Sequence, residues 1–457
     1  MNLHTKLQER EAQGKPLRIG IIGAGKFAAM YLAQAPRTPG VHIAGIADLA
    51  PAGARANLER VGWKAERCAA TSLDAALKER RTHVSEDWQA LVAHPLIDIV
   101  IEATGNPVAA VTHALFAFRN HKHVIMVSVE ADAVCGPLLA KKAQDAGVVY
   151  SLAYGDQPAI ICDLVDWARA AGFPVVAAGR GHKWLPQFAQ STPETVWQHY
   201  GLTPEQARIG GLNPKMFNSF LDGSKPAIEC TAVCNATGLT PAPNGLSYPS
   251  ASIDAIPTIM RPKSEGGCLH HKGQVEVVSS LERDGQAIPY DIRFGIWVVF
   301  EGESDYIRRC FTEYGVHTDP SGRYACMYKR WHLIGLEAGI SVACVGVRGE
   351  ATGCASGFRA DAVASAKRDL EVGEILDGEG GYTVVGKLMP AADSLRLGAL
   401  PLGLAHQVRV LKPVQAGAPV LWSDVAVDPS NDAVRLRREM EASFASPKLR
   451  YAYDKVL

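Results

Sequence analysis

The stretch Leu17–Ala28, LRIGIIGAGKFA, decides the fold, because an apolar run leads directly into the pattern Gly-x-Gly-x-x-Ala. A strand, this pattern and a helix are typical of dinucleotide-binding domains. The first glycine permits a tight turn, the second lets a pyrophosphate approach the backbone, and the alanine lets the helix pack on the strand. The alternative is a glycine turn in an unrelated α/β domain. The residues predicted to contact the cofactor here are Gly23, Ala24, Gly25, Lys26 and Phe27.

A second apolar run, Val41–Ala47, ends at Asp48. This acidic residue follows the motif by about 20 residues, where a carboxylate can accept both hydroxyls of a ribose. A negative charge at this position repels the additional phosphate of NADP. The pattern therefore predicts a dinucleotide site that prefers NAD, with NADP still open.

The composition is that of an ordinary globular enzyme. The chain has 457 residues, enough for two or three domains, with 47% hydrophobic and 21% charged residues. Its 47 basic and 47 acidic residues cancel, so no overall charge steers it to nucleic acid or membranes. The first 16 residues lack the apolar core of a secretory signal, and no apolar run approaches the roughly 18 residues of a spanning helix. We therefore expect a cytoplasmic protein.

Ten cysteines are scattered along the chain without a Cys-x-x-Cys pair, which predicts reduced and mostly buried thiols. Cys230 and Cys234 lie one helical turn apart, and packing is favoured over metal binding because no histidine has ligand spacing. Packing is also favoured for His270 and His271, since adjacent histidines point apart in a strand. A divalent metal is left open.

Between Leu17 and Tyr150 strands and helices alternate, as in a parallel sheet. Polar residues follow the buried strands, and ligands bind at such carboxyl ends near the point where the strand order reverses. We therefore expect Thr104 and Gly105 to cover the dinucleotide. Candidate catalytic acids at later strand ends are Glu130 and Asp156, with Asp132 less favoured than turn capping.

Three regions are expected. Residues 1–150 are predicted to form a Rossmann domain with a doubly wound parallel sheet. Residues 151–357 are predicted to form an α+β catalytic and oligomerisation domain, with strands near 174–178, 273–278 and 295–300. Residues 358–457 are predicted to form a small β-rich domain, with strands near 363–370, 372–376, 408–411 and 414–421, and a charged C-terminal helix. The fold class is α/β.

The segment Phe220–Glu229 carries the main catalytic candidates. Ser224 is predicted to cap a helix that has Pro226 in its first turn, which places Lys225 and Glu229 on one face with Asp222 just before it. The trio is either an exposed ion pair or a group that moves a substrate proton or positions a divalent cation.

Cations gather after the strand near 174–178, a place suited to an anionic substrate. The candidates there are Arg180, His182 and Lys183. Asn235 and Asp254 add polar groups at the starts of loops, and we assign them to the substrate as well.

Several motifs together resemble one family, the homoserine-dehydrogenase-like oxidoreductases with a C-terminal SAF domain, which include enzymes similar to 1-deoxy-D-xylulose-5-phosphate reductoisomerase. The resemblance runs from about residue 17 to 430. Its motifs are Gly23–Ala28, Asp98–Gly105, Val129–Asp132, Asp222–Lys225, Asn235–Leu239 and Ala251–Asp254, with Lys367–Leu370, Gly373–Glu374 and Val414–Gly417 similar to the SAF signature.

The resemblance implies a cleft between the first two domains and a homo-oligomer, dimer or tetramer, built through the middle region. It also implies that Glu130, Asp156, Arg180, Asp222, Lys225 and Glu229 line the cleft. Two departures matter. Reductoisomerase-like members use NADPH and have basic residues where this chain has Asp48, and Gly-Lys-Gly-Lys where it has Gly179–His182. Both put deoxyxylulose phosphate in doubt as the substrate.

The expected function is NAD-dependent oxidation, alone or with a rearrangement, of the CH–OH group of a small anionic compound such as a sugar acid. Lys225, helped by Asp222 and Glu229, would move the hydroxyl proton, and Arg180 and Lys183 would hold the anion. One alternative is an NADPH-dependent reductoisomerase that makes methylerythritol phosphate. Another is a non-enzymatic protein that binds a dinucleotide or a carbohydrate.

Overall fold

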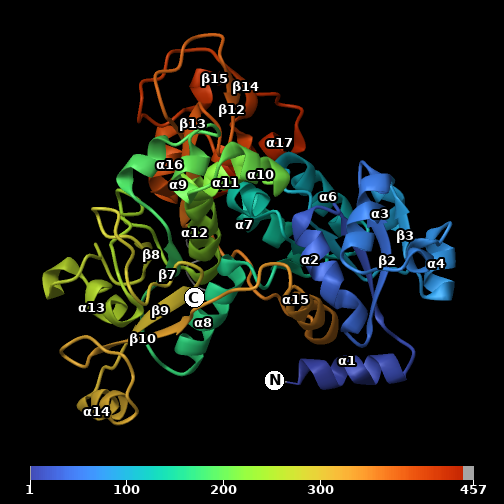
Figure 1. Cartoon of the computed structure of the whole chain (residues 1–457), viewed down its shortest axis with the longest axis horizontal. Helices are drawn as coiled ribbons and strands as arrows, with labels where there is room; N and C mark the ends of the chain where they lie inside the picture. The colour runs from blue at the N-terminus through green and yellow to red at the C-terminus, as the bar shows by residue number, and fades with distance from the viewer. Residues whose placement is uncertain (1, 446–457) are drawn as a thin grey trace. The chain divides into compact units, whose positions relative to one another are not determined.

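The computed structural model describes residues 2–445, which form two compact units (Figure 1). The N-terminal unit runs to Ile160 and includes Leu333–Cys354. The C-terminal unit comprises Ile161–His332 and, among the described residues, those from Ala355 to Ala445. No helix among the described residues is both long and apolar enough to cross a membrane.

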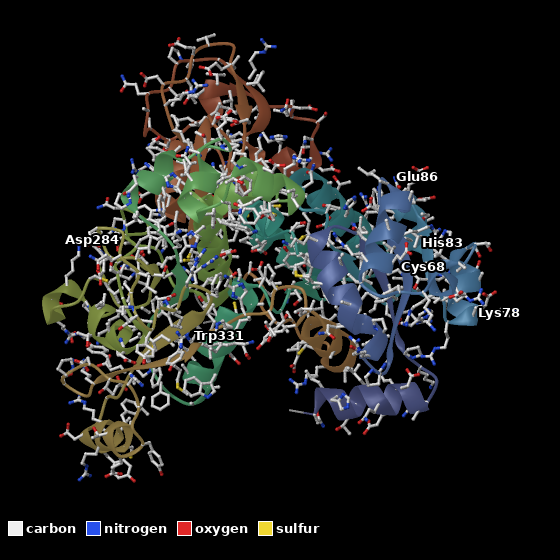
Figure 2. The ribbon with its side chains drawn as sticks, viewed as in Figure 1. Cys68, Lys78, His83, Glu86, Asp284 and Trp331 are labelled. Atoms are coloured by element: carbon white, nitrogen blue, oxygen red, sulfur yellow. The ribbon has the colours of Figure 1, made fainter. Side chains whose placement is uncertain are left out.

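A six-stranded parallel sheet forms the centre of the N-terminal unit, in the order β3-β2-β1-β4-β5-β6. The order reverses between β1 and β4, which confirms the predicted doubly wound sheet. The strands are β1 (Leu17–Ile22), β2 (Val41–Ala47), β3 (His83–Ser85), β4 (Ile99–Glu102), β5 (His123–Met126) and β6 (Tyr150–Leu152). Figure 2 marks its β3 edge with Cys68, Lys78, His83 and Glu86.

Helices precede, connect and follow these strands. They are α1 (Leu3–Ala12), α2 (Lys26–Gln34), α3 (Pro51–Arg60), α4 (Leu73–Glu79), α5 (Trp88–Ala93), α6 (Pro107–Arg119) and α7 (Val129–Asp145), followed by α8 (Gln157–Ala170). The expectation of a polar strand end at Val129–Asp132 is wrong, because these residues form the first turn of α7. Acidic side chains in a first turn interact favourably with the helix dipole.

The segment Leu333–Cys354, expected in the middle domain, returns to the N-terminal unit. Its apolar residues Ala338, Val342 and Val345 belong to the same buried cluster as Leu17 and Leu32. The segment includes α15 (Gly339–Ala343). The burial of this apolar stretch explains why these residues belong to the N-terminal unit.

The C-terminal unit contains a mixed four-stranded sheet in the order β10-β9-β7-β8, with β7 and β8 parallel and the other pairs antiparallel. Its strands are β7 (Val175–His182), β8 (Gln274–Ser279), β9 (Ile296–Glu301) and β10 (Tyr324–Lys329). The three strands predicted in this region are confirmed. The helices here are α9 (Val196–Tyr200), α10 (Pro204–Ile209), α11 (Pro214–Leu221), α12 (Ser224–Thr237), α13 (Ile256–Ile259) and α14 (Asp305–Glu313).

Helix α12 is buried on nearly every side, and it contacts β7 and β8 as well as β11 (Ala360–Ala366) and β13 (Val384–Pro390). A helix in this environment needs no polar face, which explains its weak amphipathic pattern. The remaining elements are β12 (Ile375–Asp377), α16 (Ala391–Leu397), β14 (His406–Val410), β15 (Val425–Ala426) and α17 (Asp432–Ala445).

The β-rich character of the region after residue 358 is confirmed, with two differences. The strand β13 was not predicted, and the expected strand at 414–421 contributes only isolated bridges such as Leu370↔Val414. The charged helix α17 is anchored rather than solvated, because the fully buried Arg437 forms a bidentate ion pair with Asp361 of β11. The predicted tail beyond Ala445 lies outside the described residues.

Candidate active site

The glycine loop between β1 and α2 is closely packed at Gly23 and open at Gly25. Gly23 has φ +91°, and a Cβ there would lie 2.7 Å from the carbonyl oxygen of Ala103. At Gly25, the N-cap of α2, a Cβ would meet no heavy atom within 4 Å. The N–H groups of the first helical turn therefore face an open approach, which fits a pyrophosphate.

Asp48, at the end of β2, holds this loop in place. Its carboxylate accepts hydrogen bonds from the backbone N–H of Ala24 at 2.7 Å and of Ala50 at 2.8 Å. The side chain of Asn57 donates to the carbonyl of Ala24 at 2.9 Å. A carboxylate has about four acceptor sites, so Asp48 retains capacity for ribose hydroxyls. Next to it, Leu49 is 92% exposed.

Of the other predicted cofactor residues, Lys26 is exposed and Phe27 is half-buried, both in the first turn of α2. Thr104 and Gly105 follow β4 and belong to a hydrogen-bonded group around the fully buried Glu102. Glu102 accepts bonds from the hydroxyls of Thr104, at 2.6 Å, and Ser128, and Ser128 in turn accepts the N–H of Gly105 at 2.9 Å.

Glu102 was not recognised as part of the site from the sequence. The signal was present, because a carboxylate that ends an apolar strand needs hydrogen-bond partners once it is buried. Together with His113, whose Nδ1 lies 3.2 Å from the carboxylate, these bonds fix the loop after β4.

The candidate acids of the N-terminal unit occupy different surroundings. Glu130 is half-buried in the first turn of α7. Asp156 is buried and accepts the N–H of Gln157 at 2.9 Å, beside the start of α8. Asp132 is completely buried and accepts the hydroxyl of Tyr150 at 3.0 Å. Burial raises the pKa of Asp132 to about 7.

The Asp132 carboxyl makes stability depend on pH. Because its pKa is raised above the ordinary 3.8, the folded chain holds a proton that the unfolded chain releases, and this contribution is lost as pH rises from about 4 to 7. Asp132→Asn removes this titration. We expect the free energy of unfolding of the variant to rise by a few kcal/mol relative to that of wild type between about pH 4 and 7, and the difference to stay constant at higher pH. Urea unfolding at pH 5 and pH 8 measures the change, with Asp74→Asn as an exposed control. An equal difference in unfolding free energy between Asp132→Asn and wild type at the two pH values would contradict this prediction.

In the C-terminal unit, Arg180 of β7 and Glu229 of α12 form a buried ion pair. The Arg180 Nε also donates to the carbonyl of Gly181 at 3.1 Å. Glu229 is therefore not part of an exposed ion pair on a solvated helix face, which was one of the two alternatives for this residue.

Asp222 lies in a second buried ion pair. Its carboxylate accepts the Lys367 Nζ at 2.7 Å and the N–H of Ser224 at 2.8 Å. Lys367 also donates to the carbonyls of Ser191 and Gly381, at 2.8 Å each. Lys225, in the first turn of α12, is half-buried. The expected trio is therefore split, since Asp222 pairs with Lys367 and Glu229 pairs with Arg180.

The helix start also differs from the prediction. Gly223, with φ +94°, is the N-cap of α12, and the carboxylate of Asp222 satisfies the Ser224 N–H. The Ser224 hydroxyl instead accepts the N–H of Gly386 in β13 at 2.8 Å. The capping role predicted for Ser224 is wrong, because a residue from the C-terminal β region uses its hydroxyl.

A group of cations gathers at the end of β7. Lys183 donates to the carbonyl of His199 at 2.7 Å and lies over the Tyr200 ring. Arg293, which the sequence did not single out, contributes to lowering the pKa of Lys183, after the larger effect of burial. Among residues 2–445, neither Lys183 nor the Arg293 guanidinium is paired with a carboxylate.

His182 lies in the same group, with its Nε2 against the carbonyl of Phe220. Burial lowers the pKa of His182 to about 3, and the charges of Arg180 and Arg293 contribute. The ring is therefore neutral near pH 7. Since Nε2 faces a carbonyl, it carries the proton and Nδ1 presents the lone pair.

The remaining predicted substrate residues serve other contacts. The buried Asn235 accepts the N–H of Arg359 at 2.7 Å and of Ala360 at 3.0 Å, which joins α12 to β11. Asp254 pairs with the His317 Nδ1 at 2.8 Å, and its side chain is 62% exposed. Their assignment to the substrate stays a prediction. No group of three or more His, Cys, Asp or Glu side chains within residues 2–445 has an arrangement that could hold a metal.

Two family models match the chain. Residues 20–152 match the NAD-binding domain of homoserine dehydrogenase, and residues 155–338 match the catalytic domain of oxidoreductase DRL. The chain is an NAD(P)-dependent oxidoreductase. In this oxidoreductase the first match contains the glycine loop and Asp48, and the second contains Arg180, Asp222 and Lys225. These matches confirm the predicted resemblance to homoserine-dehydrogenase-like oxidoreductases and a cofactor of the NAD(P) type, while the preference for NAD and the SAF domain stay predictions.

Comparisons with solved structures give weaker likenesses. A probable dehydrogenase from Thermotoga maritima is 13% identical, with a TM-score of 0.37 over 73% of this chain and 90% of its own. DOX-P reductoisomerase in complex with magnesium is 14% identical, with a TM-score of 0.33 over 60% and 66%. Biliverdin reductase from Synechocystis sp. PCC 6803 is 19% identical, with a TM-score of 0.27 over 42% of this chain and 55% of its own, so the oxidoreductase spans about half of that protein. All three TM-scores lie below 0.5, and the assignment rests on the family models. No curated protein sequence matches the chain.

Proposed function

We propose that the oxidoreductase catalyses an NAD-linked oxidation, alone or coupled to a rearrangement, of the CH–OH group of a small anionic compound such as a sugar acid. The observation that carries this proposal is the group of cations around Lys183 and Arg293. Both side chains lack a carboxylate partner among the described residues, and a guanidinium matches the geometry of a carboxylate. An anionic substrate would supply the missing negative charge.

The glycine loop and Asp48 would hold the cofactor, which accepts the hydride when bound. Within the C-terminal unit, Arg180 and Glu229 neutralise each other, so Arg180 would act on the substrate together with its carboxylate rather than as an isolated cation. We propose Lys225 for the movement of the hydroxyl proton, because its amine lies half-buried in the first turn of α12 and can carry a proton. Asp222 and Glu229 each hold another cation. Asp222 and Glu229 are then positioning residues.

A screen for NADH formation tests the proposal. The protein is mixed with NAD+ and a library of sugar acids, other hydroxy acids and the corresponding neutral alcohols, and absorbance of NADH is followed. We expect turnover with an acid and little with its neutral analogue. A reductive arm with 1-deoxy-D-xylulose 5-phosphate and NADPH covers the reductoisomerase alternative. Absence of NADH formation with every acid would contradict the proposal.

Arg293→Gln tests the cation group directly. We expect the KM for the acid found in the screen to rise about tenfold or more, because a charge-assisted hydrogen bond is lost, while turnover of its neutral analogue stays unchanged. Arg309→Gln is the control, since Arg309 lies over the Tyr306 ring on α14. An equal loss for the acid and the neutral compound would assign Arg293 to the fold rather than to the anion.

Asp48→Asn tests the preference for NAD. The variant removes the negative charge but retains an acceptor for the Ala24 N–H. We expect the ratio of kcat/KM for NAD+ to that for NADP+ to fall about tenfold or more, since a like-charge repulsion of about 1.4 kcal/mol corresponds to that factor. Asp74→Asn, whose side chain is 89% exposed, is the matched control. An unchanged ratio would remove Asp48 from cofactor selection.

The SAF assignment for residues 358–457, the homo-oligomer and the cytoplasmic location remain predictions. A second copy that contributes to the proposed function would be detected by the dependence of activity on protein concentration.

A further inference from the structure

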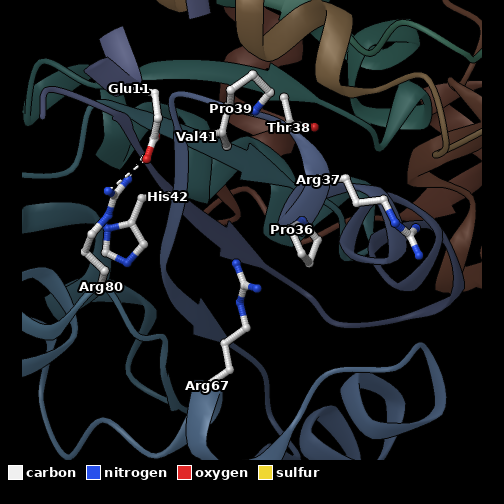
Figure 3. Close-up of a pocket in the computed structure, with 9 residues that line it drawn as sticks. All are labelled: Glu11, Pro36, Arg37, Thr38, Pro39, Val41, His42, Arg67 and Arg80. Carbon is white, nitrogen blue, oxygen red and sulfur yellow. Dashed lines mark hydrogen bonds and ion pairs between the residues drawn. The ribbon is translucent and has the colours of Figure 1, made fainter. Parts of the chain in front are cut away.

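A pocket of about 330 Å³ lies at the amino end of β2, in the N-terminal unit (Figure 3). This is the end of the strand opposite to Asp48 and the glycine loop, so the pocket is separate from the dinucleotide site. Its volume falls at the lower end of the range of about 300–1,000 Å³ for small-molecule sites. The residues that line it are Glu11, Pro36, Arg37, Thr38, Pro39, Val41, His42, Arg67 and Arg80.

The lining carries an excess of positive charge. Its three arginines face a single carboxylate, Glu11, which pairs with Arg80 at 2.9 and 3.0 Å and also accepts the N–H of Gly40 at 2.9 Å. Arg37 donates to the carbonyl of Ala33. Neither Arg37 nor Arg67 is paired with a carboxylate within residues 2–445. Two positive charges of the pocket therefore lack a counter-charge.

Arg67 is the central group of the pocket. It is half-buried, its guanidinium lies 4.6 Å from the centre of the Trp63 ring, and burial lowers its pKa. Figure 3 shows Arg67 extending into the space between His42 and Pro36, with Arg37 on the other side of Pro36. Stacking on the tryptophan fixes the guanidinium while its outer N–H groups remain available to a ligand.

The side chain of His42 lies among the same positive charges. Its ring is buried, with Nε2 at 2.7 Å from the carbonyl of Arg81. Burial lowers the pKa of His42, and the charges of Arg80, Arg67 and Arg18 lower it further. An anion in the pocket would offset these charges.

We propose that this pocket binds the phosphate group of a small molecule, either inorganic phosphate or a phosphate monoester. A dianion matches two unpaired arginines better than a single carboxylate does, and a planar guanidinium donates two parallel hydrogen bonds to phosphate oxygens. The proposal rests on residues that play no part in the proposed function and stands independently of it.

Calorimetric titration of the full-length protein, saturated with NAD+ to fill the glycine loop, tests the proposal. The probes are inorganic phosphate and glucose 6-phosphate, with glucose as the neutral control. We expect Arg67→Gln to weaken phosphate binding about tenfold or more, and Glu11→Gln to strengthen it severalfold because the opposing charge is removed. Arg60→Gln, which replaces an exposed arginine of the same unit outside the pocket, should leave binding unchanged.

Arg293→Gln separates this site from the proposed substrate site, since it should leave the phosphate affinity of the pocket intact. Stronger binding of glucose 6-phosphate than of inorganic phosphate, without binding of glucose, would assign the site to a monoester. The reverse order would assign it to the free ion. Binding that is absent in wild type or unaffected by Arg67→Gln would overturn the proposal, as would a change of oligomeric state in Arg67→Gln without any effect of phosphate.

Discussion

Gly23→Ala is expected to weaken NAD+ binding about a hundredfold or more, the difference of roughly 3 kcal/mol that follows when a pyrophosphate loses its backbone contacts. The new Cβ would lie 2.7 Å from the carbonyl oxygen of Ala103, which is backbone and cannot rotate away. The loop must therefore shift, and it carries with it the Ala24 N–H that Asp48 binds. Fluorescence or calorimetric titration of NAD+ measures the loss.

Gly62→Ala provides the matched control. Gly62 has φ +89°, nearly the same as Gly23, but a Cβ there would meet no heavy atom within 4 Å. Both variants therefore carry a similar backbone strain of about 1–2 kcal/mol, and only Gly23→Ala disturbs the cofactor loop. Equal NAD+ affinities in the two variants would show that the glycine loop does not contact NAD+.

Lys367→Met is expected to destabilise the C-terminal unit by about 3–5 kcal/mol, because it leaves the carboxylate of Asp222 buried without a counter-charge. Asp222 is 2% exposed and Lys367 is 6% exposed, so water cannot replace the lost partner. The two carbonyls that Lys367 also binds lose a donor. Urea unfolding near pH 7 measures the change, and Lys387→Met, at an exposed lysine of β13, is the control.

The pH dependence of this loss distinguishes a charge effect from a packing effect. Burial already raises the pKa of Asp222, and Lys367 opposes that rise. Without Lys367 the folded chain would protonate Asp222 more readily than the unfolded chain, so stability would fall as pH rises above the ordinary pKa of 3.8. The deficit of Lys367→Met should therefore shrink toward pH 4. A deficit that is constant with pH would indicate lost packing alone.

The double variant Asp222→Leu/Lys367→Met closes the comparison. Since both charges are removed, we expect it to be more stable than the sum of the two single changes predicts, as is found when a buried pair is replaced by apolar residues. Additive losses would show that the two side chains act independently.

The residues proposed for the cofactor could be predicted from the sequence because they are local. The turn at Gly23, the open N-cap at Gly25 and the acidic end of β2 lie within 26 residues of one another, and each follows from backbone geometry or strand order. The reversal of strand order at β1 and β4 followed from the same alternation of strands and helices.

The surroundings of the residues proposed for the substrate could not be predicted to the same extent, because their ion pairs join distant segments. Asp222 and Lys367 are 145 residues apart, and helical spacing suggested instead that Lys225 and Glu229 belong together. Arg293 lies in a turn before β9, without a motif that marks it. The helix itself was predicted, but its periodicity gave no guide to the contacts of α12, since a helix buried on nearly every side has no single apolar face to detect.

The contacts of α12 determine which truncations and chimaeras of this protein can fold. The hydroxyl of Ser224, the carboxylate of Asp222 and the amide of Asn235 each find their partner beyond residue 358. A truncation there would remove a buried partner from each of these three groups. Chimaeras that exchange the β-rich C-terminal region between homologues should therefore include α11 and α12. These segments are expected to fold together as one unit.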